Sequence, residues 1–373
     1  MNHEIQENKQ EFRLKRKDYI EWINSHIMLD KEQDSPSVSL TNEDWQNLYN
    51  IALEEGVAPY LYYCLKKSAP NLSVPPQTKQ KFVIASRNVL ARNTVLYHEL
   101  GKILMLFSEN GIPVIVLKGA YLSEIVYPHN GLRPMGDIDL LVKESDLHRT
   151  QEKLLEMGYT QSKNLSIEDQ CAKSHHLIPF TNRDAIMVEI HWTLSRHLHS
   201  SSKIVANGLW KRARSVNIAG KNVLALSPEH LILHLCFHTS CHHLYILWLK
   251  SFFDIVEVTR HYQYEICWDY VQQCARSWNI CRSIYITLHF VKELLRVDVP
   301  ERVLVTLKQE DFNLGMINLI SEKIFAERDK TPMDQRLAQL WGANRSKAKA
   351  ILQILKIAFP PKVIIFRKYI ISQ

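Results

Sequence analysis

The stretch that most constrains the fold is residues 114–142, where two short apolar runs enclose a turn, a helix-like segment and an Asp-x-Asp motif. The first run ends at Lys118 and Gly119, and the second begins with Asp137 and Asp139. Side chains two residues apart in a strand share one face. The sequence therefore predicts strand, turn, helix and strand, with both carboxylates on one face and apolar side chains in the core.

This order of elements favours a particular chemistry. Two carboxylates on one strand face repel each other unless a cation lies between them. Oxygen ligands of this kind suit Mg²⁺, which often takes one or two carboxylates together with substrate phosphates. The Lys-Gly turn stands where a strand becomes a helix, and free backbone N–H groups there favour an anion. We expect a Mg²⁺ site beside a phosphate-binding turn.

A second pattern lies further along the chain. Residues 177–192 have the alternation of a hairpin with a short polar turn. On the second strand of that hairpin, Glu189 and His191 point to one face while Val188 and Ile190 point to the other. The pattern predicts one more carboxylate and an imidazole on the same side of a sheet.

These motifs together resemble the minimal core of the polymerase-β-like nucleotidyltransferase superfamily. The motifs R-P-M-G-D-I-D-L-L-V at 133–142 and V-E-I-H-W at 188–192 are similar to those of one branch, the uncharacterised nucleotidyltransferase family of bacterial proteins. The resemblance implies an α+β fold with a small mixed β-sheet core flanked by helices, an N-terminal helical segment and a helical C-terminal half. We expect the regions 1–110, 111–226 and 227–373.

The resemblance also implies the metal ligands and the reaction. Asp137, Asp139 and Glu189 would hold two Mg²⁺ ions, with Glu189 as the carboxylate from the neighbouring strand. The donor would be an NTP, and its monophosphate would pass to a hydroxyl or phosphate of a small-molecule, sugar or peptide acceptor. His191 would orient a phosphate, ligate metal or hydrogen-bond Glu189.

Three residues of the turns are candidates for phosphate binding. Lys118 and Arg133 would each either neutralise phosphate oxygens or pair with an Asp, and Gly119 would let the backbone approach the phosphates. Most relatives carry Gly-Ser in place of Lys118 and Gly119, and their serine hydroxyl contacts the phosphates. This chain has no hydroxyl there.

Two other functions stay open. The segment 335–373 has eight Lys or Arg residues and no Asp or Glu, so nucleic acid is a possible partner. A transferase acting on RNA or protein, of the tRNA-modifying toxin type, is therefore one alternative, although no RNA-binding motif supports it. A catalytically inactive nucleotide-binding protein is the other, against which the three carboxylates argue because unpaired acids are costly to keep.

The C-terminal half is expected to be helical from Ser227 onward, with Ser227 as the N-cap. Histidines recur there every four residues, at His230, His234, His238 and His242, either as a zinc site or as a structural stripe beside the nucleotide cleft. Asp254 is a candidate supporting or substrate-contacting group. Cysteines spaced by seven, at 267, 274 and 281, are expected on one helical face as reduced thiols.

Composition sets the remaining bounds. The chain has 373 residues, a formal net charge of +7 and seven cysteines without a C-x-x-C pair. No apolar run reaches the roughly 18–20 residues that span a bilayer, and the first residues are polar and charged. We expect a cytoplasmic protein. Helical patterns at 11–27, 42–55 and 79–110, the last as one helix or two, precede the first strand.

Overall fold

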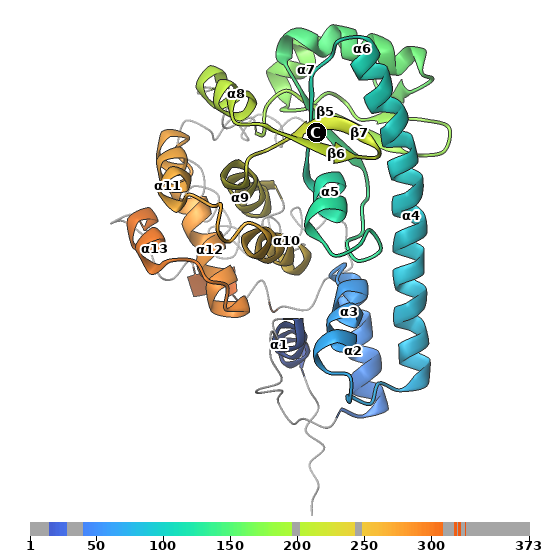
Figure 1. The fold of residues 1–373 in the computed structure, drawn as a ribbon, viewed down its shortest axis with the longest axis vertical. Coiled ribbons are helices and arrows are strands. Elements are labelled where there is room, and N and C mark those ends of the chain that lie inside the picture. Colours follow the sequence, from blue (N-terminus) through green and yellow to red (C-terminus); the bar gives the residue numbers. More distant parts are fainter. Residues whose placement is uncertain are drawn as a thin grey trace, which may run out of the picture.

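The computed structural model describes residues 15–27, 40–195, 202–242 and 248–308, together with 317, 318, 320, 321 and 325. A mixed seven-stranded sheet in the order β3-β4-β5-β2-β1-β7-β6 lies between helices (Figure 1). The strands are β1 (Val114–Val116), β2 (Ile138–Val142), β3 (Thr160–Gln161), β4 (Phe180–Thr181), β5 (Met187–His191), β6 (Arg214–Ile218) and β7 (Lys221–Ala225). The predicted α+β class is confirmed.

Helices precede the sheet, connect its strands and follow it (Figure 1). They are α1 (Arg16–Ile27), α2 (Asn42–Glu54), α3 (Ala58–Ser68), α4 (Pro76–Glu109), α5 (Lys118–Tyr121), α6 (Leu147–Glu156), α7 (Ile167–Lys173), α8 (Ser202–Lys211), α9 (Pro228–Phe237), α10 (Trp248–His261), α11 (Trp268–Ser277), α12 (Cys281–Leu295) and α13 (Glu301–Leu307). The predicted division at 110 and 226 falls between elements and stays a prediction.

The N-terminal helices follow the predicted pattern. Thr41 caps α2 through a reciprocal capping box, in which its hydroxyl accepts from the Asp44 backbone N–H and the Asp44 carboxylate accepts from the Thr41 backbone N–H. The pattern at 79–110 forms the single helix α4 rather than two. In Figure 1, α4 runs the length of the molecule, from the level of α1–α3 up to the sheet.

The centre of the sheet is apolar because its strands are covered on both sides. All residues of β1 and β2 are buried. Strand β1 pairs antiparallel with β2 and parallel with β7, while β2 pairs parallel with β5. The predicted hairpin is confirmed as β4 and β5, which pair antiparallel. The chain between β1 and β2 forms α5 and then a π-helical turn, Leu122–Val126.

The hairpin of β6 and β7 was not predicted. Its two strands pair antiparallel around Ala219 and Gly220. Both turn residues have positive φ, 52° and 70°, as a tight two-residue hairpin of the type favoured by strand twist requires. The usual Asn or Asp is replaced by alanine, which weakens the sequence signal. The hairpin extends the sheet beyond β1.

The C-terminal helices begin as predicted. Ser227 caps α9 by accepting a hydrogen bond from the His230 backbone N–H, and every residue of α9 is buried. His230 stacks on Trp278 with ring centroids 5.6 Å apart, and burial lowers the pKa of His230 to about 4. His230 and His234 therefore belong to the core. The side chain of His242 and the basic segment 335–373 lie outside the described residues.

The prediction that three cysteines share one helical face is wrong. Cys267 is the exposed N-cap residue of α11, Cys274 is buried within α11, and Cys281 is the first residue of α12. The chain turns at Asn279, whose φ of 55° ends the helical path. All seven cysteines are free thiols. None of the described helices combines the length and the apolar composition that a membrane crossing requires.

Candidate active site

The site is built on two neighbouring parallel strands. In β2 and β5, Asp139 stands directly beside Glu189. The flanking residues Ile138 and Val188 are fully buried on the opposite face. Period-two alternation therefore turns both carboxylates to the same side, as the sequence predicted. The third carboxylate of the resemblance does come from the strand beside the Asp-x-Asp motif.

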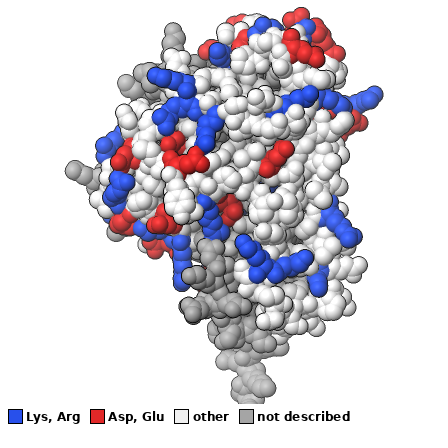
Figure 2. Space-filling model, in the orientation of Figure 1, with Lys and Arg blue, Asp and Glu red and all other residues white. Residues whose placement is uncertain are grey.

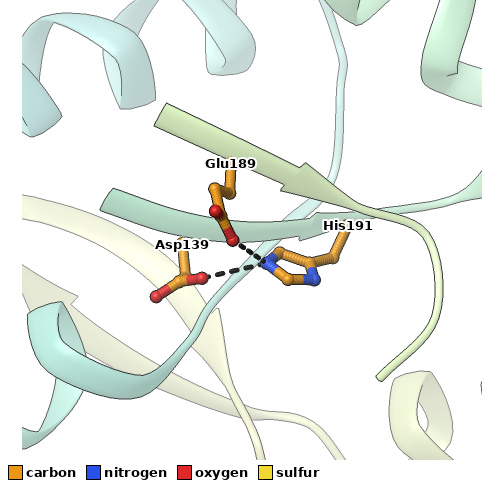
Figure 3. Close-up of side chains that lie close together, drawn as sticks. All are labelled: Asp139, Glu189 and His191. Carbon is orange, nitrogen blue, oxygen red and sulfur yellow. Dashed lines mark hydrogen bonds and ion pairs between the residues drawn. The ribbon is translucent and has the colours of Figure 1, made fainter. Parts of the chain in front are cut away.

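His191 joins these two carboxylates (Figure 3). Its Nε2 lies 2.9 Å from Oδ1 of Asp139 and 3.4 Å from Oε2 of Glu189. One ligand atom from each of the three side chains lies within 4.8 Å of the others. His191 is buried, so its Nε2–H donates to Asp139 in a region with little water. Among its predicted roles, a contact with the carboxylates is the one present here.

Lys118 supplies a positive charge beside the carboxylate of Asp139. Its Nζ donates to the same Asp139 oxygen at 2.7 Å. The backbone of Lys118 has φ 42°, a left-handed conformation uncommon outside glycine. Burial by itself would raise the pKa of Asp139, but Lys118 and His191 hold that pKa well below its usual range. Asp139 is therefore an ionised carboxylate, and Lys118 adopts the predicted pairing with an Asp.

Asp137 has a different environment. It lies in the bend directly before β2 and is partly buried. Burial, followed by the charges of Asp139 and Glu189, raises the pKa of Asp137 to about 6. No hydrogen bond or ion pair to its side chain occurs among the described residues. Repulsion from neighbouring carboxylates is the condition that a bound cation would relieve.

Arg133 forms an ion pair with a carboxylate of α10. Its Nε and Nη2 donate to Oδ1 and Oδ2 of Asp254 at 3.1 and 2.8 Å. The hydroxyl of Tyr127 donates to the same Oδ1 at 2.9 Å. Arg133 and Asp254 are both buried. Of the two predicted roles for Arg133, pairing with an Asp is the one present, while a phosphate contact stays a prediction.

Gly119 makes room for that arginine. A Cβ added at this position would stand 2.5 Å from Nη1 of Arg133 and 3.2 Å from Cγ of Met135. Such distances are too short for any larger residue without movement of the guanidinium. The glycine thus lets the turn and the Arg133 side chain lie in contact. Its predicted approach to phosphates stays a prediction.

The residues present fit a divalent cation. Two carboxylates and an imidazole converge, and Oδ2 of Asp139 accepts no hydrogen bond within the described part of the chain. Carboxylate oxygens suit Mg²⁺ and Mn²⁺. The candidate metal site includes Asp139 and Glu189 as predicted, and His191 supports it by donating its Nε2–H to Asp139. Asp137 lies outside the three-residue cluster but within its electrostatic field.

Comparison with known proteins identifies the family. A family model described as "Uncharacterised nucleotidyltransferase" matches residues 41–296. The chain belongs to that family, as the sequence motifs predicted. A solution structure of the antibiotic-resistance factor ANT(2'')-Ia is similar, with 14% identity over 54% of this chain and 98% of that chain and a TM-score of 0.35. No curated protein matched.

Proposed function

We propose that this protein is a divalent-metal-dependent nucleotidyltransferase that moves a nucleoside monophosphate from an NTP to a hydroxyl or phosphate of a small-molecule, sugar or peptide acceptor. The observation that carries the proposal is the alignment of Asp139 with Glu189 on adjacent strands, beside the turn at Lys118. Membership of the family supports the reaction class. The donor, the metal and the acceptor are the proposed part.

Asp137, Asp139 and Glu189 are the proposed metal ligands. A bound divalent cation neutralises phosphate oxygens and lowers the pKa of an acceptor hydroxyl. The three carboxylates and the Lys118 ammonium group leave two negative charges, which match one divalent ion. We therefore assign one ion to the free protein and a second to the complex with the NTP, because the triphosphate adds negative charge.

Lys118 and His191 have positioning roles in this proposal. Both donate to Oδ1 of Asp139, and they keep that carboxylate ionised and fixed in direction. Oδ2 is left to face a cation. The acceptor oxygen then forms a bond to the α-phosphorus of the donor, and the bond from that phosphorus to the pyrophosphate oxygen breaks. Pyrophosphate leaves, and a hydroxyl acceptor releases its proton to solvent.

Thermal stability with nucleotides tests the donor and the metal. Each of the four NTPs is added with and without Mg²⁺ or Mn²⁺, to wild-type protein and to Asp137→Asn. A ligand that binds only the native state adds about 2.7 kcal/mol at a hundredfold excess over Kd. We expect a metal-dependent shift with at least one NTP, reduced in the variant. Absence of any shift would contradict the proposal.

A second candidate acceptor is nucleic acid. The basic segment 335–373 favours it, whereas basic and acidic side chains lie interspersed on the face drawn in Figure 2. Incubation with α-labelled NTP and separated fractions of small molecules, RNA and protein distinguishes the acceptors. Label in the small-molecule fraction supports the main proposal, and label in RNA supports the second candidate.

A further inference from the structure

The cations around the site differ in what they bind. Lys118 is paired with Asp139, and Arg133 is paired with Asp254. Lys250, near the start of α10, makes no hydrogen bond or ion pair with any described residue. Unlike Lys118 and Arg133, it has no carboxylate in direct contact within the part of the chain that the structure describes.

Several contacts place Lys250 next to the site. It stands four residues before Asp254 on α10, which puts both side chains on the same face of that helix. That face meets Arg133, and α10 lies against the π-helical turn that follows α5 (Figure 1). Lys250 therefore projects from the C-terminal helices toward the turn that leads into Asp137.

The stem of Lys250 is held by the N-terminal region. A Cβ added at Gly56 would stand 3.3 Å from Cδ of Lys250 and 3.7 Å from Cγ of Pro134. Gly56 has φ +70°, a conformation that favours glycine. The connection between α2 and α3 thus packs on the lysine stem and on the turn that carries Arg133, and it limits where the ammonium group can lie.

The environment of the ammonium group is electrostatically mixed. Burial, followed by the charge of Arg133, lowers the pKa of Lys250 to about 8, while Asp254, Asp137 and Asp139 act in the opposite direction. The group is thus mostly protonated at neutral pH. A partly buried cation without a direct partner is costly because burial removes the water that would solvate it, and a bound anion would offset that cost.

We propose that Lys250 binds the polyphosphate of the donor nucleotide. This inference rests on the proposed function. A lysine ammonium group is a compact point charge that suits phosphate oxygens. The turn residues Lys118, Gly119 and Ala120 offer no side-chain hydroxyl to a phosphate. Lys250 supplies a phosphate contact from the opposite side, and closes the nucleotide between the sheet and α10.

The test compares Lys250→Met, which removes the charge and keeps most of the stem, with Lys250→Arg. Titration calorimetry measures the affinity for the NTP that wild-type protein binds and for inorganic tripolyphosphate, both with Mg²⁺. We expect Lys250→Met to weaken both affinities about 10–100-fold, the range of a hydrogen bond to a charged group. Lys250→Arg retains most of the affinity. Lys292→Met, which removes a lysine paired with Glu301, is the matched control and leaves both affinities unchanged.

A purely structural role for Lys250 is separated by the melting temperature of the ligand-free protein. Removal of an unpaired cation beside Arg133 should leave this temperature unchanged or raise it, whereas loss of a structural residue would lower it. Wild-type affinity in Lys250→Met would overturn the inference and leave the proposed function intact. Failure of the wild-type protein to bind any NTP would instead overturn the proposed function.

Discussion

Arg133 and Asp254, 121 residues apart in the sequence, form two hydrogen bonds that join the turn before β2 to α10. Both side chains are buried. The turn that leads into the Asp-x-Asp motif is therefore fixed to the C-terminal helices by this ion pair. Because the charges compensate each other away from water, loss of either one leaves the other uncompensated.

Asp254→Ala should destabilise the protein by about 3–5 kcal/mol, the usual cost of breaking a buried ion pair. Urea unfolding measures the change. The matched control is Asp269→Ala, which removes the partner of Arg302 in an exposed ion pair. The control should change stability by less than about 1 kcal/mol. Equal losses in both variants would contradict the importance of burial.

Substitution of either aspartate of the motif should lower turnover, but the two substitutions should change the stability of the protein in opposite directions. Asp137→Asn and Asp139→Asn should each lower turnover by roughly 10³-fold or more if they hold the metal. Asp137→Asn should raise stability near pH 7.5 by ~1–2 kcal/mol, because it removes a carboxylate whose pKa is raised. Asp139→Asn should lower stability, since Lys118 loses its partner. If chemical denaturation shows that the free energy of unfolding changes in the same direction in both variants, this charge assignment is refuted.

Gly119→Ala should cost about 1–3 kcal/mol, the usual penalty for overpacking. The added Cβ would meet Nη1 of Arg133 at 2.5 Å and press on the ion pair with Asp254. Gly208→Ala in α8 is the control, because a Cβ there meets nothing within 4 Å. It should stabilise the helix by up to about 1 kcal/mol. Wild-type stability in Gly119→Ala would mean that the guanidinium moves freely.

Binding of divalent metal should strengthen as pH rises from 5 to 7. Asp137 has a pKa of about 6, so it is neutral below that pH and must lose a proton to bind a cation. Calorimetric titration with Mn²⁺ should give about one ion per free protein and proton release that is largest below pH 6. In Asp137→Asn the affinity should be weaker and nearly independent of pH in this window. A pH-independent wild-type affinity would exclude Asp137 as a ligand.

The sequence predicted the two central strands because their patterns are local. Alternation in β2 and β5 puts the carboxylates Asp139 and Glu189 on one face and the apolar side chains on the other. In a buried sheet the apolar face must meet the core, so the direction of the carboxylates is fixed. The placement of Glu189 on the strand beside the Asp-x-Asp motif followed from the resemblance and not from spacing, and the parallel direction of that pairing was not predicted. The hairpin at β6 and β7 was missed because alanine occupies the turn position where asparagine gives the usual signal.

The remaining site contacts depend on tertiary packing. The sequence left two roles open for Arg133, and its pairing with Asp254 depends on the position of α10 in the folded chain. Lys250 attracts attention only in the folded chain, where no described residue forms a hydrogen bond or ion pair with it. The steric need for Gly119 likewise arises from a side chain that lies close only in the folded chain. No local pattern encodes such relationships.

The register between β2 and β5 links folding to the site, because the pairing that buries the apolar side chains also places the carboxylates side by side. The register is set where the two strands pair, from Ile138 beside Val188 to Leu141 beside His191. A deletion of one residue within β5 would turn Glu189 and His191 into the core and Val188 toward the carboxylates. Charged groups in the core would prevent folding. A chain that folds has therefore already aligned its carboxylates.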